Sequence, residues 1–439
     1  MNEFLRTCAT GIAMATACIA MTAQQATPVT PPATPALTLA DAEHLAIEHN
    51  PRISIARLLQ LAQAQVTREA RSSELPTAAI NLTAVDSHDG SRITAGGLNN
   101  PIVYERAAGG ITVSQLITDF GRTHNLVLSA QSQARAQADV QRATTADIVL
   151  AVDQAFYSAL GRQAVLKVAE RTVAARQATA DQIGALAESK LRSSLDSSFA
   201  NVELSQARLL LLDAQNAKQE SMANLNALLG SEQDQQYSLV DQAPSQPEPA
   251  PDHIEPLVQM AFNARPDLAA LQENSVAARQ FSRAEHDLNR PTVSALGTAG
   301  GAPVRPDQIT SSWYGAVGAN VNIPFFNGFL YSARAREADL RASAAQEGVR
   351  NLRELIDRDV RTSALSAQAD FHRIEVTRQL LDQSNLALDL AQTRYKLGLS
   401  GIVELSQAQL AQTQAEIAYA KARYAYQTAL AVLSFQTGQ

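Results

Sequence analysis

The chain has 439 residues, of which 36 are basic and 43 acidic, so its formal charge is −7 and its pI is near 5.6. This balance, without a dense Lys/Arg block, argues against a nucleic-acid binder, because neutralising phosphates requires a concentrated basic surface. Both cysteines, Cys8 and Cys18, lie near the N-terminus. The rest of the chain therefore offers no cysteine-ligated metal site, thiol nucleophile or disulfide framework.

The N-terminal segment has the pattern of a secretion signal. Arg6 precedes the apolar stretch 11–20, and small residues follow up to Ala23. This predicts a signal peptide over 1–23, cleaved after Ala20 or Ala23, with lipidation of Cys18 as the alternative. The Thr/Pro/Ala-rich stretch 24–37 is predicted to be a disordered leader. No later run reaches the roughly 18 consecutive apolar residues of a spanning helix, so a membrane form would have to be a β-barrel.

The remainder of the chain is an internal repeat. A proline-rich linker, 241–252, separates a first repeat over 38–240 from a second over 253–439. Pairs separated by 215 residues are Leu45 with Met260 and Pro76 with Pro291, and pairs separated by 208 are Asp119 with Asn327, Asp196 with Glu404 and Gly230 with Gly438. A constant register over so many residues indicates duplication.

Each repeat is predicted to contain a long helical hairpin. Proline is absent between Pro101 and Pro244 and after Pro324, and a helix interior tolerates proline poorly. We expect helices over 122–187 and 331–395, each roughly 100 Å long, followed by a break and a returning helix. The second returning helix carries alanines at heptad spacing from Ala408 to Ala429, which indicates coiled-coil packing.

Two short hairpins, 77–116 and 292–323, switch to a period of two. The clearest run places Val317, Val321 and Ile323 between polar or small residues, with Trp313 and Tyr314 at its start. Such runs approach the 9 to 11 residues of a tilted membrane strand, although half-buried hairpins of a soluble protein are the alternative. Four strands cannot close in lipid, two chains would give a filled barrel of eight, and three would give twelve strands around a lumen.

This duplicated order resembles the TolC family of outer-membrane efflux proteins, also called outer membrane factors. The resemblance is carried by the order of elements, by the joint segments 115–122 and 322–328, and by the segment 394–404. It implies a mainly α fold with membrane β: duplicated long helical hairpins forming an α-barrel, and four β-strands per chain contributing to a trimeric β-barrel of twelve strands. The protein would lie in the cell outer membrane, with the helical barrel in the periplasm.

The function implied is a homotrimeric exit duct of a tripartite efflux or type I secretion system. It would pass substrates from an inner-membrane transporter of the RND, ABC or MFS type, through a periplasmic membrane-fusion adaptor, across the outer membrane. We expect no enzyme activity, cofactor or metal; Glu43, His44, Glu48 and His49 lie close in sequence, but histidines five apart share one helical face poorly. The alternative is a secreted or periplasmic coiled-coil scaffold.

Three groups of site residues follow. The predicted joints between strands and helices are Pro76, Asp119, Gly121, Pro291, Pro324 and Gly328, and the predicted adaptor-docking tips are Lys190, Arg192, Ser193, Leu399, Ser400 and Gly401. The predicted periplasmic aperture gate is Asp196 and Glu404, with Tyr395 and Gln407 at positions matching the family and Arg192 as the partner of a neighbouring acid. The alternative for the two acids is interaction with the helix dipole, worth roughly 0.3 to 1 kcal/mol.

Overall fold

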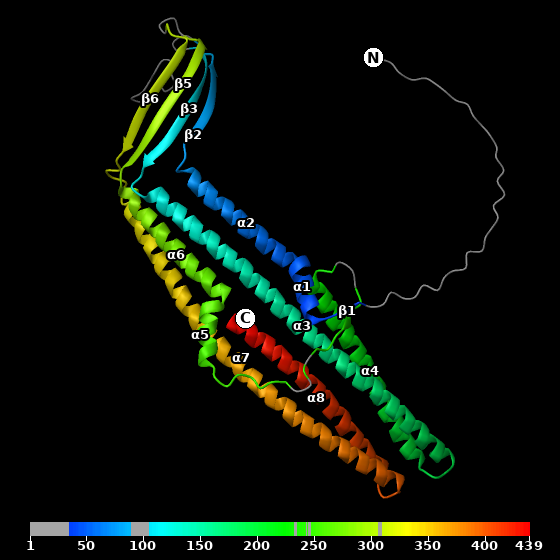
Figure 1. The fold of residues 1–439 in the computed structure, drawn as a ribbon. Helices are drawn as coiled ribbons and strands as arrows, with labels where there is room; N and C mark the ends of the chain where they lie inside the picture. Colours follow the sequence, from blue (N-terminus) through cyan, green and yellow to red (C-terminus); the bar gives the residue numbers. More distant parts are fainter. Residues whose placement is uncertain (1–34, 89–104, 232–234, 243, 245–246, 306–309) are drawn as a thin grey trace, which may run out of the picture.

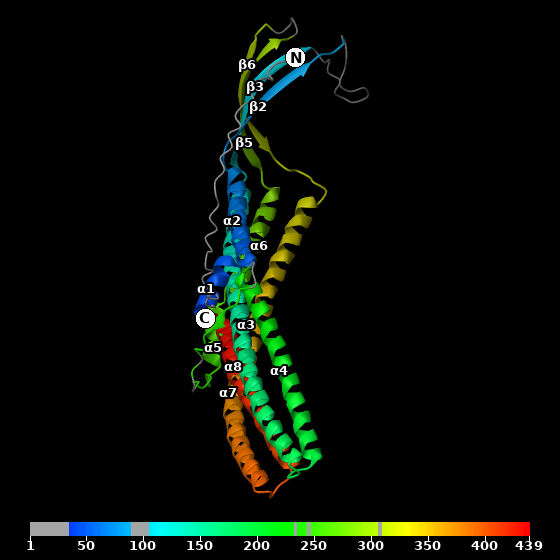
Figure 2. The same cartoon turned by 90° about the vertical axis from the view of Figure 1, so that its right-hand side faces the viewer.

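The computed structural model describes residues 35–88, 105–231, 235–242, 244, 247–305 and 310–439. The predicted signal peptide, both cysteines and most of the predicted leader lie outside these residues. The described chain is elongated, with a β-sheet at one end, two helical tips at the other, and short helices at mid-length (Figures 1 and 2).

Two long helices run from the sheet to the tips. They are α3 (Arg122–Glu188) and α7 (Leu330–Lys396), each of 67 residues, which is about 100 Å at the helical rise per residue. The returning helices are α4 (Ser194–Leu229) and α8 (Ile402–Thr437), each of 36 residues. The helical hairpins predicted from the spacing of prolines are therefore present in both repeats.

The helix that precedes each strand hairpin is split in two. The first repeat has α1 (Leu39–His49) and α2 (Pro51–Ser72), and the second has α5 (Glu255–Ala264), α6 (Pro266–His286) and the 3-10 turn η1 (Asp287–Asn289). Asn50 and Arg265, the residues before the two prolines, have extended backbones. A residue before proline is driven out of the helical region, so the proline starts a new helix.

The sheet has four antiparallel strands in the order β2-β3-β5-β6. These are β2 (Thr77–Val85), β3 (Arg106–Thr118), β5 (Thr292–Val304) and β6 (Trp313–Asn322). The two hairpins are joined by pairing of β3 with β5, which brings the repeats together side by side. Consequently β2 and β6 are the end strands.

A second, small sheet was not predicted. Strand β1 (Ala36–Leu37) pairs in parallel with β4 (Ser238–Leu239), so the last two residues of the predicted leader are part of the fold. The linker that follows is held against the helices: Tyr424 donates a hydrogen bond to Asp241 at 2.7 Å, Tyr426 donates to the carbonyl of Glu248, and Gln368 donates to that of Pro251. The linker thus lies across α7 and α8 and is held to both helices by hydrogen bonds.

The helices are arranged in one layer. Near the sheet, α2 packs on α3, α3 on α6 and α6 on α7; near the tips, α4 packs on α3, α3 on α8 and α8 on α7. The largest buried cluster lies at mid-length, where Phe156 and Leu225 pack with residues of α1 and the small sheet. Val152 and Val360, equivalent in the two repeats, are both fully buried. Across the described ranges, no helix has both the length and the apolar content needed to cross a membrane.

Candidate functional site

The two helical tips lie together at the end opposite the sheet (Figures 1 and 2). A buried cluster joins them: Ile183 of α3 and Leu204 of α4 pack with Tyr395 of α7 and Leu405 of α8. Because apolar contacts hold the tips side by side, polar residues from both repeats come within reach of one another at this end.

Both tips turn in the same way. The amide of Leu191 donates to the carbonyl of Leu186, and that of Leu399 donates to Arg394, both at 2.9 Å. Each turn has one left-handed residue, Lys190 with φ 59° and Gly398 with φ 74°. These are equivalent positions in the repeat, so the turn geometry places a lysine in a conformation that glycine adopts more easily.

The returning helices begin differently. Ser193 caps α4, because its hydroxyl accepts a hydrogen bond from the amide of Leu195 at 3.1 Å. Gly401 precedes α8 and has no side chain for this role. Asp196 and Glu404 lie in the first turns of α4 and α8, where negative charge is favoured by the helix dipole.

Arg192 connects the two tips. Its Nη2 donates a hydrogen bond to the carbonyl of Tyr395 at 3.0 Å, and its guanidinium lies 4.4 Å from the centre of the Tyr395 ring. Within the single chain the partner of Arg192 is thus Tyr395, and its pairing with a neighbouring acid stays a prediction. Tyr395 is buried between the repeats at the end of α7, and its carbonyl also accepts a hydrogen bond from the amide of Gly398 at 3.0 Å.

Tyr395 is 7% exposed, and its hydroxyl is buried without a hydrogen-bond partner. Burial raises the pKa of this hydroxyl, the charge of Arg192 lowers it, and the charge of Asp196 raises it. Three of the predicted gate residues, Arg192, Tyr395 and Asp196, thus meet at the contact between the tips. A buried hydroxyl without a hydrogen-bond partner lowers stability, so the packing around Tyr395 carries a free-energy cost.

The other two predicted gate residues lie apart from this contact. Glu404 forms an ion pair with Arg394 at 2.9 Å within the second tip, and Gln407 is exposed on α8. Arg394 was missed as a site residue, although it lies in the segment used to recognise the tip. The ion pair of Arg394 with Glu404 forms because the turn brings the end of α7 close to the start of α8.

The predicted docking residues lie on the outer surface of the tips. Lys190, Ser193, Leu399 and Gly401 are exposed, while Arg192 and Ser400 are half-buried. The hydroxyl of Ser400 is itself buried and has no partner. The docking residues therefore combine two basic side chains, Lys190 and Arg192, with apolar and small residues.

The predicted joints lie where strands meet helices. Asp119 is buried and accepts hydrogen bonds from Thr123 and Gly121 at the start of α3, and its equivalent Asn327 accepts one from Tyr331. Left-handed residues follow both: Phe120 and Gly121 in the first joint, Gly328 and Phe329 in the second. Pro76 and Pro291 directly precede β2 and β5, and Pro324 follows β6.

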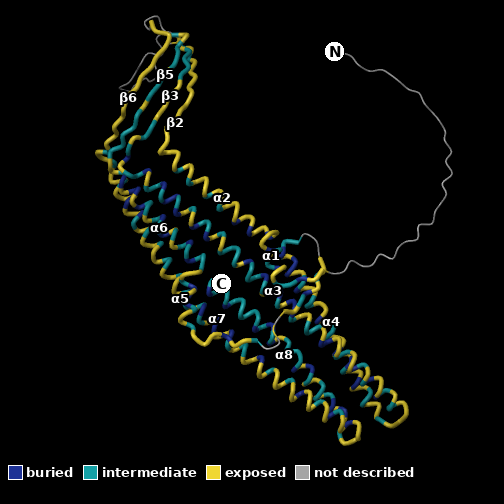
Figure 3. The backbone as a smooth tube through the Cα atoms, in the orientation of Figure 1, coloured by how far each residue is buried: buried dark blue, intermediate teal, exposed yellow. Residues whose placement is uncertain are grey.

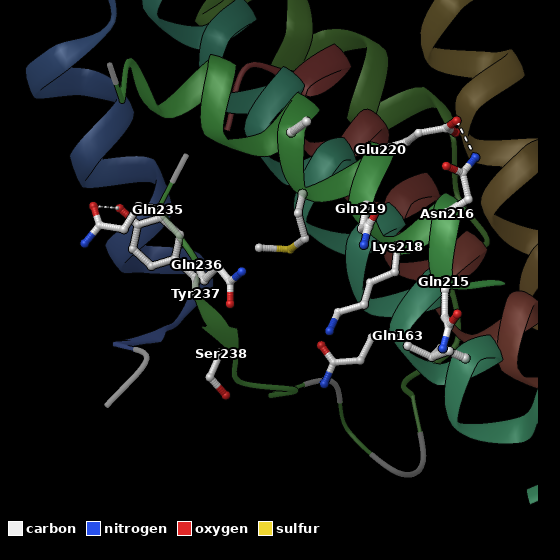
Figure 4. A pocket seen from close by; sticks show the side chains of 13 residues that line it. Gln163, Gln215, Asn216, Lys218, Gln219, Glu220, Gln235, Gln236, Tyr237 and Ser238 are labelled. Atoms are coloured by element: carbon white, nitrogen blue, oxygen red, sulfur yellow. Dashed lines mark hydrogen bonds between the residues drawn. The ribbon is translucent and has the colours of Figure 1, made fainter. Parts of the chain in front are cut away.

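A polar groove of about 1040 Å³ lies between α3, α4 and the residues leading into β4 (Figure 4). Its labelled side chains are mainly amides, among them Gln163, Gln215 and Gln219, with Tyr237 on the opposite wall. Glu220 in this groove accepts a hydrogen bond from Asn216 at 2.8 Å. Amides neither transfer protons readily nor act as nucleophiles.

The acids and histidines of α1 do not form a metal-binding cluster. His44 contacts Glu48 at 3.6 Å, and Nδ1 of His49 lies 3.1 Å from the carbonyl of Leu45. Among the residues that the structure describes, no group of three or more His, Cys, Asp or Glu side chains is placed to hold a metal ion.

Comparison with known proteins agrees with this architecture. The model of the family described as "Outer membrane efflux protein" matches residues 43–231 and 257–439, one match for each repeat. Outer membrane protein OprJ of Pseudomonas aeruginosa is 26% identical over 306 residues, which are 68% of this chain and 63% of OprJ. The alignment thus spans less than two thirds of that relative.

Solved structures show the same fold. A membrane protein from Pseudomonas aeruginosa superposes with a TM-score of 0.79 at 22% identity, covering 91% of this chain and 93% of the other. The Campylobacter jejuni CmeC outer membrane channel superposes with a TM-score of 0.80 at 15% identity, covering 91% and 85%. The predicted fold class is confirmed.

Proposed function

The chain belongs to the outer membrane efflux protein family, and from this membership we propose that it is an exit duct through which substrates cross the periplasm and the outer membrane. The observation that carries the proposal is that the layer of strands and helices is open at both sides in a single chain. Copies of the chain that join at these sides enclose a tube.

The sheet supplies the membrane part of the duct. One face carries apolar residues such as Ile80, Ile111 and Val317, and the other carries polar residues such as Asn81 and Thr112, which are linked by a hydrogen bond of 3.1 Å. A membrane barrel has this alternation, with apolar residues toward lipid and polar residues toward the lumen. Three copies supply twelve strands, enough to leave a lumen.

The helices supply the periplasmic part. At one side of the layer, α2 exposes Leu58 and Leu59, and α4 exposes Leu209 and Leu212. At the other side, α7 exposes Leu380, Leu386 and Leu390. These side helices are largely exposed in the single chain (Figure 3). Exposed apolar surfaces of this extent favour contact between α7 of one copy and α2 and α4 of the next.

We further infer that the tips close the inner end of the tube and receive the adaptor. Arg192 on Tyr395 holds the two repeats together there, and Arg394 holds Glu404 within the second repeat. In a trimer, Asp196 and Glu404 contribute six carboxylates around the narrow end, and a low-dielectric wall concentrates their field. The exposed tip residues, including Lys190 and Leu399, then face a periplasmic adaptor coupled to an inner-membrane transporter of the RND, ABC or MFS type.

The experiment is conductance of the purified protein in planar bilayers. We expect a low resting conductance that prefers cations, and replacing Asp196 and Glu404 together by alanine should reduce both cation preference and block by divalent cations. A matched control removes two exposed acids far from the tips, Glu69 and Glu220, and should leave selectivity unchanged. Failure of the wild-type protein to form any pore would favour the coiled-coil scaffold, and unchanged selectivity in the tip variant would leave the acids only a helix-capping role.

A further inference from the structure

Four glycines form a compact patch inside the sheet. In the antiparallel pairing of β3 with β5, Gly109 is opposite Gly301 and Gly110 is opposite Gly300. Glycine weakens a strand, because it has no side chain to pack and loses much conformational freedom on folding. Adjacent glycines on neighbouring strands therefore indicate that another group approaches the backbone closely at this point.

That group is the ring of Tyr314. Tyr314 in β6 is opposite Gly300 in the pairing of β5 with β6, so Tyr314, Gly300 and Gly110 form one row across three strands. A Cβ atom added at Gly300 would lie 2.5 Å from Cζ of Tyr314. One added at Gly110 would lie 3.0 Å from the same carbon and closer still to the hydroxyl oxygen. The ring therefore lies flat across β5 and reaches β3.

The ring is on the polar face of the sheet. Side chains alternate along a strand, so Tyr314 shares its face with Asn320 and Asn322, while Trp313, Val317 and Val321 are on the other face. In the proposed duct the polar face lines the lumen. A large aromatic side chain can lie there without projecting from the wall only because the two glycines leave space beneath it.

The position of Tyr314 in the sheet gives this packing a consequence for assembly. Strand β6 is an end strand, paired with β5 alone among the described strands. A slip of one residue in its register would turn every side chain to the opposite face and move its free edge. Tyr314 opposes such a slip, because its ring fits only over Gly300 of β5 and Gly110 of β3. The ring thus connects β6 to β3, a strand with which β6 is not paired.

We propose that Tyr314, seated on Gly110 and Gly300, is a positioning residue that fixes β6 in register for pairing with β2 of a second copy of the chain. The inference rests on the proposed assembly of copies into a closed tube. It predicts that the loss of the ring reduces assembly more than it affects the fold of the single chain, since the sheet retains its backbone pairing.

The test compares the ratio of trimer to monomer in detergent after graded heating. Tyr314→Ala should lower this ratio by roughly fivefold or more at a temperature where the wild-type protein is half dissociated, with unchanged circular dichroism of the monomer. Tyr314→Phe keeps the ring and should behave as the wild type. An unchanged ratio for Tyr314→Ala would overturn the inference.

Variants of the glycines test the contact between the Tyr314 ring and the strands beneath it. Gly110→Ala should lower the ratio in the wild-type background and lower it much less in Tyr314→Ala, where the ring is absent and the added Cβ meets only the carbonyl oxygen of Ala299, at 2.9 Å. Gly318→Ala is the matched control, because Gly318 is on the same face of β6 and an added Cβ there meets nothing within 4 Å. Equal loss from Gly110→Ala in both backgrounds would contradict the inference, whereas a wild-type protein without trimers would refute the assembly on which it rests.

Discussion

Gly230 and Gly438 end the two returning helices in the same way. Both are left-handed, with φ 71° and 80°, and each packs against the break between the short helices of its own repeat. A Cβ atom at Gly230 would lie 2.6 Å from the carbonyl oxygen of His49, and one at Gly438 would lie 2.8 Å from Cβ of Ala264. The junction of short and returning helices is thus duplicated along with the sequence.

This geometry predicts a difference between glycines that share a positive φ. Gly230→Ala should lower the free energy of unfolding by about 2 kcal/mol or more, because both the backbone angle and a contact with backbone atoms oppose the methyl group. Gly398→Ala should cost only about 1 kcal/mol, since an added Cβ there meets nothing within 4 Å. Thermal unfolding of the two variants measures the difference, and equal costs would contradict the close packing at Gly230.

The sequence identified where the tip residues lie but not which residues they contact. The equivalence of Asp196 and Glu404 and their places in first helical turns follow from the repeat and from the breaks at 190–193 and 398–401. The contact of Arg192 with Tyr395 does not, because it joins a turn of the first repeat to a helix of the second, distant in sequence. Only the packing of one repeat on the other decides which acceptor Arg192 reaches.

Helices α1 and α3 are connected by two carboxyl groups. Asp153 of α3 and Glu43 of α1 are joined by a hydrogen bond between their carboxyl groups. Burial, followed by the charge of Glu43, raises the pKa of Asp153 to about 7. The folded protein then holds a proton that the unfolded chain releases above its ordinary pKa near 3.8. Stability should therefore fall as pH rises from about 4 to about 7.

The variant Asp153→Asn should remove this fall and raise the free energy of unfolding at pH 8 by about 1 to 2 kcal/mol, after discounting for the partial exposure of the carboxyl group. Denaturant unfolding at pH 5 and pH 8 measures the effect. Asp181→Asn, which changes an exposed acid on the same helix, is the control and should leave the pH dependence intact. An identical pH dependence in Asp153→Asn and the wild type would count against the shared proton.

Among the elements, the long helices and the strands could be predicted and the connections between repeats could not. Absence of proline and alternation of apolar residues are local signals, and both helices of 67 residues begin and end within one residue of the predicted bounds. The pairing of β3 with β5 joins strands that are separated in sequence by α3, α4, the linker, α5 and α6. Strands β1 and β4 have two residues each, too short for any period to appear.

For the molecule as a whole, the sheet is predicted to be needed for insertion but not for folding of the helices. Deleting residues 77–116 removes β2 and most of β3 while leaving the buried clusters at mid-length and at the tips intact. The variant should retain its helical circular dichroism and fail to form heat-resistant trimers in outer membranes. Stable membrane trimers of the variant would refute the requirement for four strands per chain.

In the proposed assembly, the open sides of one chain are closed by other copies, which makes a tube. The most direct test is the native mass of the protein extracted in mild detergent from outer membranes. Three chains per particle are expected, because three copies give twelve strands around a lumen and join each α7 to α2 and α4 of a neighbour. A particle of one or two chains would contradict this assembly.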